Sequence, residues 1–196
     1  MVYIIDEEIK LLNNTLASTI WRDSGNSLAS KTLLAVGGTV LLAISAKVQV
    51  PFWPVPMTMQ TFVVLVLGIA YGSRLGAVTG VLYLVEGAVG LPVFAKGAGM
   101  AYLIGPTGGY LIGFVIAMYV VGLLAEKHWD RTVIGIIGAM LIGEVIIFAL
   151  GVGWLATIIG FIKAIAGGLT PFLLAEVFKI ALATLSVPFV WKRLTR

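Results

Sequence analysis

An acid and a base lie three residues apart near the end of the chain, inside an otherwise apolar run. Glu176 and Lys179 fall within "TPFLLAEVFKIALATLSVPFVW", which extends from Thr170 to Trp191. Residues three apart share one face of a helix, so the two side chains can simply neutralise each other. The pair also offers an acceptor for N–H donors and a cation for a carboxylate, and ionisable groups inside apolar spans usually serve a function. We therefore interpret Glu176 and Lys179 as part of a binding site.

Other polar and aromatic side chains interrupt the apolar runs. Gln60 and Glu86 are further candidates for polar contacts with a ligand, although Glu86 could equally fasten a loop. Glu144 follows Gly143 and is interpreted as a buried structural acid that desolvation keeps protonated. Several aromatic residues could stack on a ligand or form the interfacial belt of a membrane protein, and for any single one the belt is the simpler interpretation; they are Phe52, Trp53, Tyr83, Phe94 and Tyr110.

The composition indicates which solvent surrounds the folded chain. The chain has 196 residues, is 60% hydrophobic, has 11% charged residues and a mean hydropathy of +1.07. Soluble domains carry about 25% charged residues, so this apolar surface requires a lipid bilayer. The chain contains no cysteine, which excludes disulfides and thiolate chemistry, and its net charge of +4 does not indicate a nucleic-acid binder.

Hydropathy predicts an all-α integral membrane protein with six transmembrane helices in one domain, residues 28–196. Residues 1–27 form a polar, amphipathic N-terminal extension, which either lies on the membrane surface or is a solvated arm. The spans are read from apolar runs of about 17–25 residues between charges. They are expected at Leu28–Val48, Met57–Tyr71, Leu75–Leu91, Thr107–Ala125, Thr132–Leu150 and Leu169–Trp191, with Gly151–Gly168 as a partly helical connection.

Basic residues predict the orientation. With both termini in the cytoplasm, nine Lys and Arg residues lie on that side and three, Lys47, Lys96 and Lys163, on the other. This follows the positive-inside rule and requires an even number of spans. The outer connections are then the long ones, so we expect structured outer loops that cap a cavity, because irregular backbone near lipid must be buried or line a cavity.

Two absences exclude other classes of protein. The sequence has no G-x-x-x-x-G-K-[ST] motif, so it does not bind ATP through a P-loop. Its one histidine, His128, lies in a cytoplasmic turn, and without a second histidine or a cysteine a transition-metal site is not expected. The sequence thus predicts no enzyme and no cofactor.

Small residues recur along the first expected span. Ala35, Thr39, Ala43 and Ala46 form a stripe that permits close helix contact. The stripe either packs within the chain or docks another membrane protein.

Three segments together resemble a known family. "PVPMTMQTFVVLVLGIAYGSRLGAVTGVLYLVEGAVGLPVFA", "GPTGGYLIGF" and "PFLLAEVFKIALA" occur in the order and spacing of the BioY family, the biotin-specific substrate-binding components of energy-coupling-factor (ECF) vitamin transporters. The resemblance covers about Leu34 to Trp191. It implies a six-helix protein of the cytoplasmic membrane that binds biotin near the outer surface. It also implies a transmembrane coupling protein and two cytoplasmic ATPases as partners, which alone would use ATP.

The resemblance also implies roles for individual residues. The acid–x–x–Lys of the family's last helix corresponds to Glu176 and Lys179. Lys179 is expected to bind the carboxylate of biotin, with Lys96 as the next candidate, and Glu176, Gln60 and Glu86 to bind its polar ends between Tyr83 and Tyr110. Ala35, Thr39 and Ala43 are expected to dock the coupling protein. The alternatives are a component for another vitamin, a facilitator without ATPases, and a membrane-embedded enzyme or assembly factor.

Overall fold

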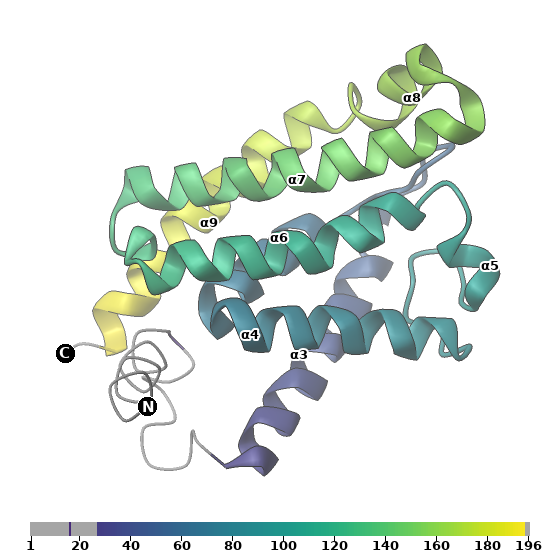
Figure 1. Cartoon of the computed structure of the whole chain (residues 1–196). Coiled ribbons are helices and arrows are strands. Elements are labelled where there is room, and N and C mark those ends of the chain that lie inside the picture. Colours follow the sequence, from purple (N-terminus) through teal and green to yellow (C-terminus); the bar gives the residue numbers. More distant parts are fainter. Residues whose placement is uncertain (1–15, 17–26, 195–196) are drawn as a thin grey trace, which may run out of the picture.

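The chain folds into a bundle of helices, seen in a computed structural model that describes residue 16 and residues 27–194 (Figure 1). The expected extension of residues 1–27 lies almost entirely outside the described residues. The elements, labelled as in Figure 1, are the helices α3 (Leu28–Lys47), α4 (Gln60–Ala88), α5 (Met100–Leu103), α6 (Gly108–Glu126), α7 (Val133–Ile159), α8 (Phe161–Gly168) and α9 (Leu173–Leu194), the strands β1 (Gln49–Val50) and β2 (Met57–Thr58), and the 3-10 turn η1 (Trp129–Arg131).

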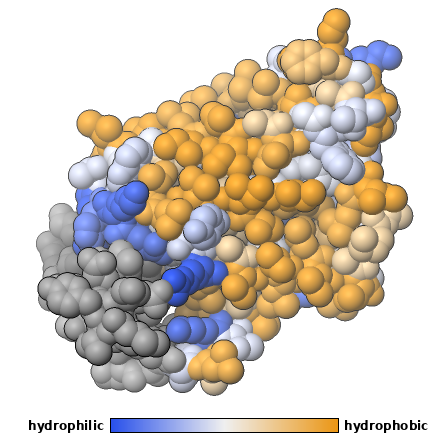
Figure 2. All heavy atoms as spheres, viewed as in Figure 1, coloured by the Kyte–Doolittle hydropathy of each residue, from blue (hydrophilic) through white to orange (hydrophobic). Residues whose placement is uncertain are grey.

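Four of these helices are long and apolar enough to cross a membrane. They are α3, α4, α6 and α7, and α8 with α9 forms a fifth candidate that is bent by 47°. Large apolar side chains face outward along these helices, for example Ile134, which is 84% exposed. Figure 2 shows an orange apolar surface across the visible middle of the molecule, with blue gathered at its left end. This outward-facing apolar surface fits a lipid solvent.

Helix α4 is two helices that fold back on each other. Gly72 has φ 78° and ψ 179°, which is not helical. In a straight helix Gln60 and Tyr83 would be about 34 Å apart, at 1.5 Å per residue, but the Gln60 amide donates a 2.8 Å hydrogen bond to the Tyr83 hydroxyl. A Cβ on Gly76 would also lie 3.6 Å from the Cα of Gly68. Residues 60–71 and 73–88 are therefore two antiparallel arms, as the predicted turn after Tyr71 requires.

The turn between the arms is held by the end of α6. Gly72 takes the positive φ that glycine adopts without strain. The Glu126 carboxylate accepts hydrogen bonds from the backbone N–H of Ser73 at 2.7 Å and from the Ser73 hydroxyl at 2.8 Å. An acid at this position satisfies a free N–H at the start of the second arm and complements the helix dipole.

The predicted end of the fifth span, at Leu150, is wrong. Helix α7 continues through Gly151 and Gly153 to Ile159 and ends at Gly160, whose φ is 86°. A glycine costs a helix only about 1 kcal/mol. At Gly151 a Cβ would collide with the ring of Tyr110, so this glycine admits a neighbouring helix and does not break its own. Only α8 remains of the expected connection.

The small-residue stripe of α3 faces the interior. Ala35 and Thr39 are buried, and the Thr39 hydroxyl donates a 2.9 Å hydrogen bond to the Glu86 carboxylate on the second arm of α4. Ala43 is half-buried. In this conformation the stripe packs within the chain, and its role in docking a partner stays a prediction.

A short hairpin replaces the expected start of the second span. Gln49 pairs with Thr58 and Val50 with Met57, antiparallel, and the helix begins only at Gln60. Figure 1 shows α5 and α8 at the same end of the bundle. The tip of the hairpin packs against α8, as the 2.9 Å between a Cβ built on Gly167 and the Pro54 ring shows. We call this end of the bundle the loop end.

Candidate functional site

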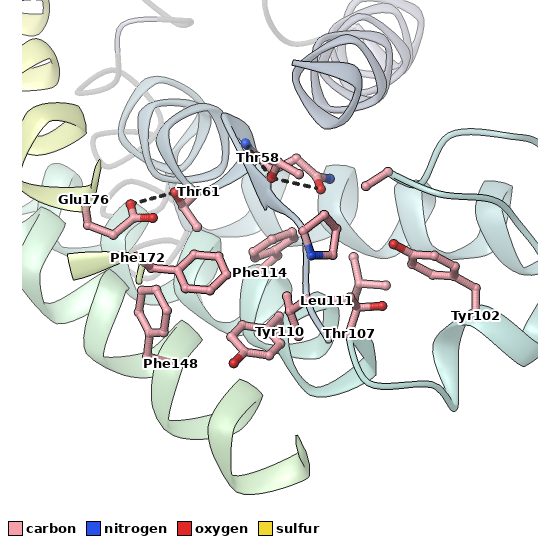
Figure 3. A pocket seen from close by; sticks show the side chains of 14 residues that line it. Thr58, Thr61, Tyr102, Thr107, Tyr110, Leu111, Phe114, Phe148, Phe172 and Glu176 are labelled. Carbon is pink, nitrogen blue, oxygen red and sulfur yellow. Dashed lines mark hydrogen bonds between the residues drawn. The ribbon is translucent and has the colours of Figure 1, made fainter. Parts of the chain in front are cut away.

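A cavity lies below the loop end, where the hairpin and α5 meet the helices α4, α6, α7 and α9 (Figure 3). Its walls combine aromatic and aliphatic side chains with a few polar groups. The lining residues are Val55, Pro56, Thr58, Gln60, Thr61, Ala95, Tyr102, Thr107, Tyr110, Leu111, Phe114, Phe148, Phe172 and Glu176. An apolar cavity with a few convergent polar groups is the usual form of a small-molecule site.

The aromatic wall is made of rings in edge-to-face contact. The Phe148 ring lies 6.0 Å from that of Tyr110 and 5.8 Å from that of Phe172. The Tyr110 hydroxyl donates a 2.8 Å hydrogen bond to the Gly168 carbonyl, which fixes the ring against α8. Such rings give a rigid apolar surface for a flat ligand. Tyr110 is thus brought to the site as predicted.

Glu176 and Lys179 form a buried ion pair at the floor of the cavity. The Lys179 ammonium is 2.8 Å from Glu176 Oε1, and both residues are 5% exposed. The ammonium also donates to the Thr58 carbonyl at 2.7 Å and to the Thr61 hydroxyl at 2.9 Å, and the Thr61 hydroxyl donates to Glu176 Oε2 at 2.8 Å. All three ammonium protons thus have acceptors, as a buried cation requires.

The two charged residues face different spaces. Glu176 lines the aromatic cavity, whereas Lys179 lines a more open groove on the other side of β2, between the hairpin and α9. Thr58 and Thr61 lie between them. A ligand anion that pairs with Lys179 must therefore replace one of its three present acceptors.

Gln60 lines the cavity and is held from behind by Tyr83. The Tyr83 ring is buried. Its hydroxyl accepts the hydrogen bond of the Gln60 amide and donates its proton to the Val93 carbonyl at 2.9 Å. Tyr83 packs edge-on against Phe94, 5.4 Å between ring centres. Tyr83 therefore lies outside the cavity lining, and its expected contact with a ligand stays a prediction.

Two other predicted site residues lie outside the cavity lining. Glu86 is half-buried on the side facing α3, where it accepts the hydrogen bond of Thr39, so its side chain joins two helices. Lys96 is exposed and donates a 3.2 Å hydrogen bond to the Phe52 carbonyl of the hairpin loop. Its neighbour Ala95, rather than Lys96, reaches the cavity.

Sequence reasoning did not single out several residues that line the cavity. Phe172 precedes Glu176 by four positions and Phe114 follows Tyr110 by four, so each shares a helix face with a predicted site residue. That spacing was a usable signal. The spacing along one helix gives no such signal for Thr58, Thr61, Tyr102 and Phe148, which also line the cavity.

A family model supplies the identification. The model described as "BioY family" matches residues 15–196, which is nearly the whole chain and includes part of the segment assigned above to an extension. The chain belongs to the BioY family. The sequence-based recognition is thereby confirmed.

Curated relatives agree with this assignment. A protein of Thermotoga maritima named biotin transporter BioY is 40% identical over 149 residues, which cover 75% of this chain and 87% of the relative. A probable biotin transporter BioY of Pyrococcus horikoshii is 38% identical over 146 residues, 74% of this chain and 86% of the relative. One of Rickettsia prowazekii is 32% identical and covers 92% of both chains.

A solved structure has the same fold. The crystal structure titled as the S-component for biotin from an ECF-type ABC transporter superposes with a TM-score of 0.72, covering 84% of this chain and 92% of that one. The two sequences are 22% identical. The likeness confirms the helical membrane fold of this BioY chain.

Proposed function

We propose that this chain binds biotin and acts as the substrate-binding component of an ECF transporter for uptake across the cytoplasmic membrane. The observation that carries the proposal is the cavity in which Glu176 and Gln60 meet an aromatic wall, with the cation of Lys179 directly behind Thr61. Family membership supports it, because curated relatives of this length are named biotin transporters.

The chemistry of biotin fits the polar groups of the cavity. Its ureido group has N–H donors and a carbonyl, its fused rings are apolar, and its tail ends in a carboxylate. Glu176 supplies the acceptor for N–H groups and Gln60 the amide for the carbonyl, while Tyr110 and Phe148 enclose the rings. Lys179 supplies the cation for the carboxylate by exchanging one of its three acceptors. Tyr83 acts by holding Gln60.

Glu86 and Lys96 receive indirect roles in this proposal. Glu86 fastens α3 to α4 through Thr39, and Lys96 fastens the hairpin loop over the cavity through the Phe52 carbonyl. Both contacts stabilise the walls around the ligand without touching it.

The membrane arrangement belongs to the same proposal. We infer six spans, namely α3, the two arms of α4, α6, α7 and α9, with both termini in the cytoplasm and the loop end outside. The antiparallel arms of α4 and the basic asymmetry of the loops support this count and orientation. Labelling of a terminal tag from outside intact cells would contradict it.

The partners follow from the proposed class. A transmembrane coupling protein and two cytoplasmic ATPases would supply ATP hydrolysis, and α3 with Ala35, Thr39 and Ala43 is the proposed docking element. The chain itself carries no cofactor in this proposal. The alternative of a membrane-embedded enzyme is disfavoured, because the relatives are named as transporters or as a transporter component.

Uptake in cells tests the proposal. The chain is expressed with and without an ECF module in a bacterium that cannot take up biotin, and uptake of labelled biotin is measured with an excess of unlabelled vitamins. We expect unlabelled biotin alone to compete, and uptake to need the module. Competition by another vitamin at lower concentration would assign a different substrate, and uptake without the module would indicate a facilitator.

A further inference from the structure

A third ionisable residue lies beside the ion pair and has no role in the proposed contacts with biotin. Glu144 lies on α7 and is 6% exposed. Its carboxyl group interacts electrostatically with the carboxyl group of Glu176 and with the charge of Lys179. Neither Glu144 oxygen accepts a hydrogen bond from a described residue. A buried carboxylate without a donor is costly, so this group requires an explanation.

The charges around Glu144 do not balance if both acids are ionised. Among the described residues Lys179 is the cation that acts on Glu144, and its three protons already point to Glu176, Thr61 and Thr58. Gly143, which precedes Glu144 in α7, faces the aliphatic side chains of Leu65 and Val121. Two carboxylates that share one cation in a dry site favour binding of a proton between them.

We propose that Glu144 is a protonated acid that donates a hydrogen bond to Glu176, and that it positions Glu176 for the ligand. Protonation removes the negative charge for which the Glu144 oxygens find no donor among the described residues, and it gives Glu144 a proton to donate to Glu176. The three groups together are neutral: one ammonium, one carboxylate and one carboxylic acid. The sequence indicated a buried, protonated structural acid, and the positioning of Glu176 adds a role in the site.

The role in ligand binding rests on the proposed function. When a ligand carboxylate accepts a hydrogen bond from the Lys179 ammonium in place of Glu176, the Glu176 carboxylate loses one donor. The Glu144 hydroxyl remains and keeps the Glu176 carboxylate oriented toward the cavity. A hydrogen bond to a charged group is among the stronger ones, so its loss is expected to weaken binding about tenfold.

Infrared difference spectroscopy tests the proton without any ligand. The full-length protein in detergent at neutral pH is expected to show the carbonyl-stretch band of a protonated carboxylic acid. The band is expected to disappear in E144Q and to persist in E86Q, a matched control at an acid that already accepts a hydrogen bond from Thr39. Absence of the band from the wild type, or its persistence in E144Q, would overturn the proposal whatever the protein binds.

Binding of labelled biotin separates positioning from simple packing. E144Q keeps an N–H donor for Glu176 and is expected to change the affinity less than about threefold. E144L has similar size but no donor, and is expected to weaken binding about tenfold while it keeps or raises thermal stability. Equal affinity of E144L and wild type would overturn the positioning role. A wild type that shows the infrared band but does not bind biotin would contradict only the proposed function.

Discussion

The hydroxyl of Thr61 donates a 2.8 Å hydrogen bond to Glu176, 115 residues further along the chain. The same hydroxyl oxygen accepts a 2.9 Å hydrogen bond from the Lys179 ammonium. One small side chain thus joins both members of the ion pair and ties α4 to α9 at the floor of the cavity. Thr61 thus holds both members of a pair that also contact each other directly.

Replacement of Thr61 by valine tests this arrangement. Valine has the same shape but neither donates to Glu176 nor accepts from Lys179, so buried groups lose partners. We expect a loss of about 1–3 kcal/mol in the free energy of unfolding and weaker biotin binding. Thermal denaturation and equilibrium binding measure the two effects. Thr79→Val is the matched control, because Thr79 is also buried in α4 but bonds the Leu75 carbonyl of its own helix; equal effects of the two variants would contradict the account.

Replacement of Lys179 by alanine tests its role as the carboxylate partner. Binding of biotin is expected to weaken by about 1.5–3 kcal/mol, as for a hydrogen bond to a charged group. Binding of a biotin amide is expected to weaken much less, because the neutral tail attracts the cation little. Both ligands are measured by equilibrium binding to wild type and variant. Equal weakening of acid and amide, with the fold intact by thermal denaturation, would exclude Lys179 from this role.

Lys96 provides the comparison for that experiment. It is exposed and contacts the hairpin loop, so Lys96→Ala is expected to weaken acid and amide alike and only slightly. A selective loss of the acid in Lys96→Ala would move the carboxylate partner from the buried pair to the loop.

Two glycines in α7 test the aromatic wall. A Cβ at Gly151 would collide with the Tyr110 ring, whereas one at Gly153 meets nothing within 4 Å. Gly151→Ala is expected to displace the ring, destabilise the fold by about 1–3 kcal/mol and weaken ligand binding. Gly153→Ala is expected to raise the free energy of unfolding by up to about 1 kcal/mol and to leave binding unchanged. The same response from both variants would show that the ring contact does not matter.

Helix α3 provides a test of partner docking. Ala43→Leu is expected to leave biotin binding intact and to reduce co-purification with the coupling protein, because close helix approach needs small side chains. Gly37→Leu is the comparison on the exposed side of the same helix, where a Cβ meets no atom within 4 Å. If Gly37→Leu blocks co-purification and Ala43→Leu does not, the partner binds the outer face of α3 instead of the stripe.

Much of the helix arrangement could be predicted from the sequence. The spans expected to end at Tyr71 and to begin at Leu75 predicted the turn that the structure places at Gly72. The structure departs from the prediction around Gly151, because a glycine that accommodates the ring of Tyr110 resembles a helix breaker when its own segment is considered alone. The hairpin was also missed, since its strands have only two residues each.

Part of the site could also be predicted, namely the residues that stand out within their own segment. Charged residues inside apolar runs are conspicuous, and Glu176 and Lys179 were found in this way. Thr61 was not, because a hydroxyl in an apolar helix usually bonds its own backbone, as Thr184 bonds the Ile180 carbonyl. Only the approach of α9 gives Thr61 its partners. Contacts between distant segments therefore had to come from the structure.

Equilibrium dialysis of labelled biotin against the purified chain in detergent, without any partner protein, tests the central claim most directly. The account predicts saturable binding at a single site per chain, displaced by unlabelled biotin and reduced by Thr61→Val but not by Thr79→Val. A folded protein that shows no saturable binding of biotin, or that releases biotin more readily to another vitamin, would contradict it.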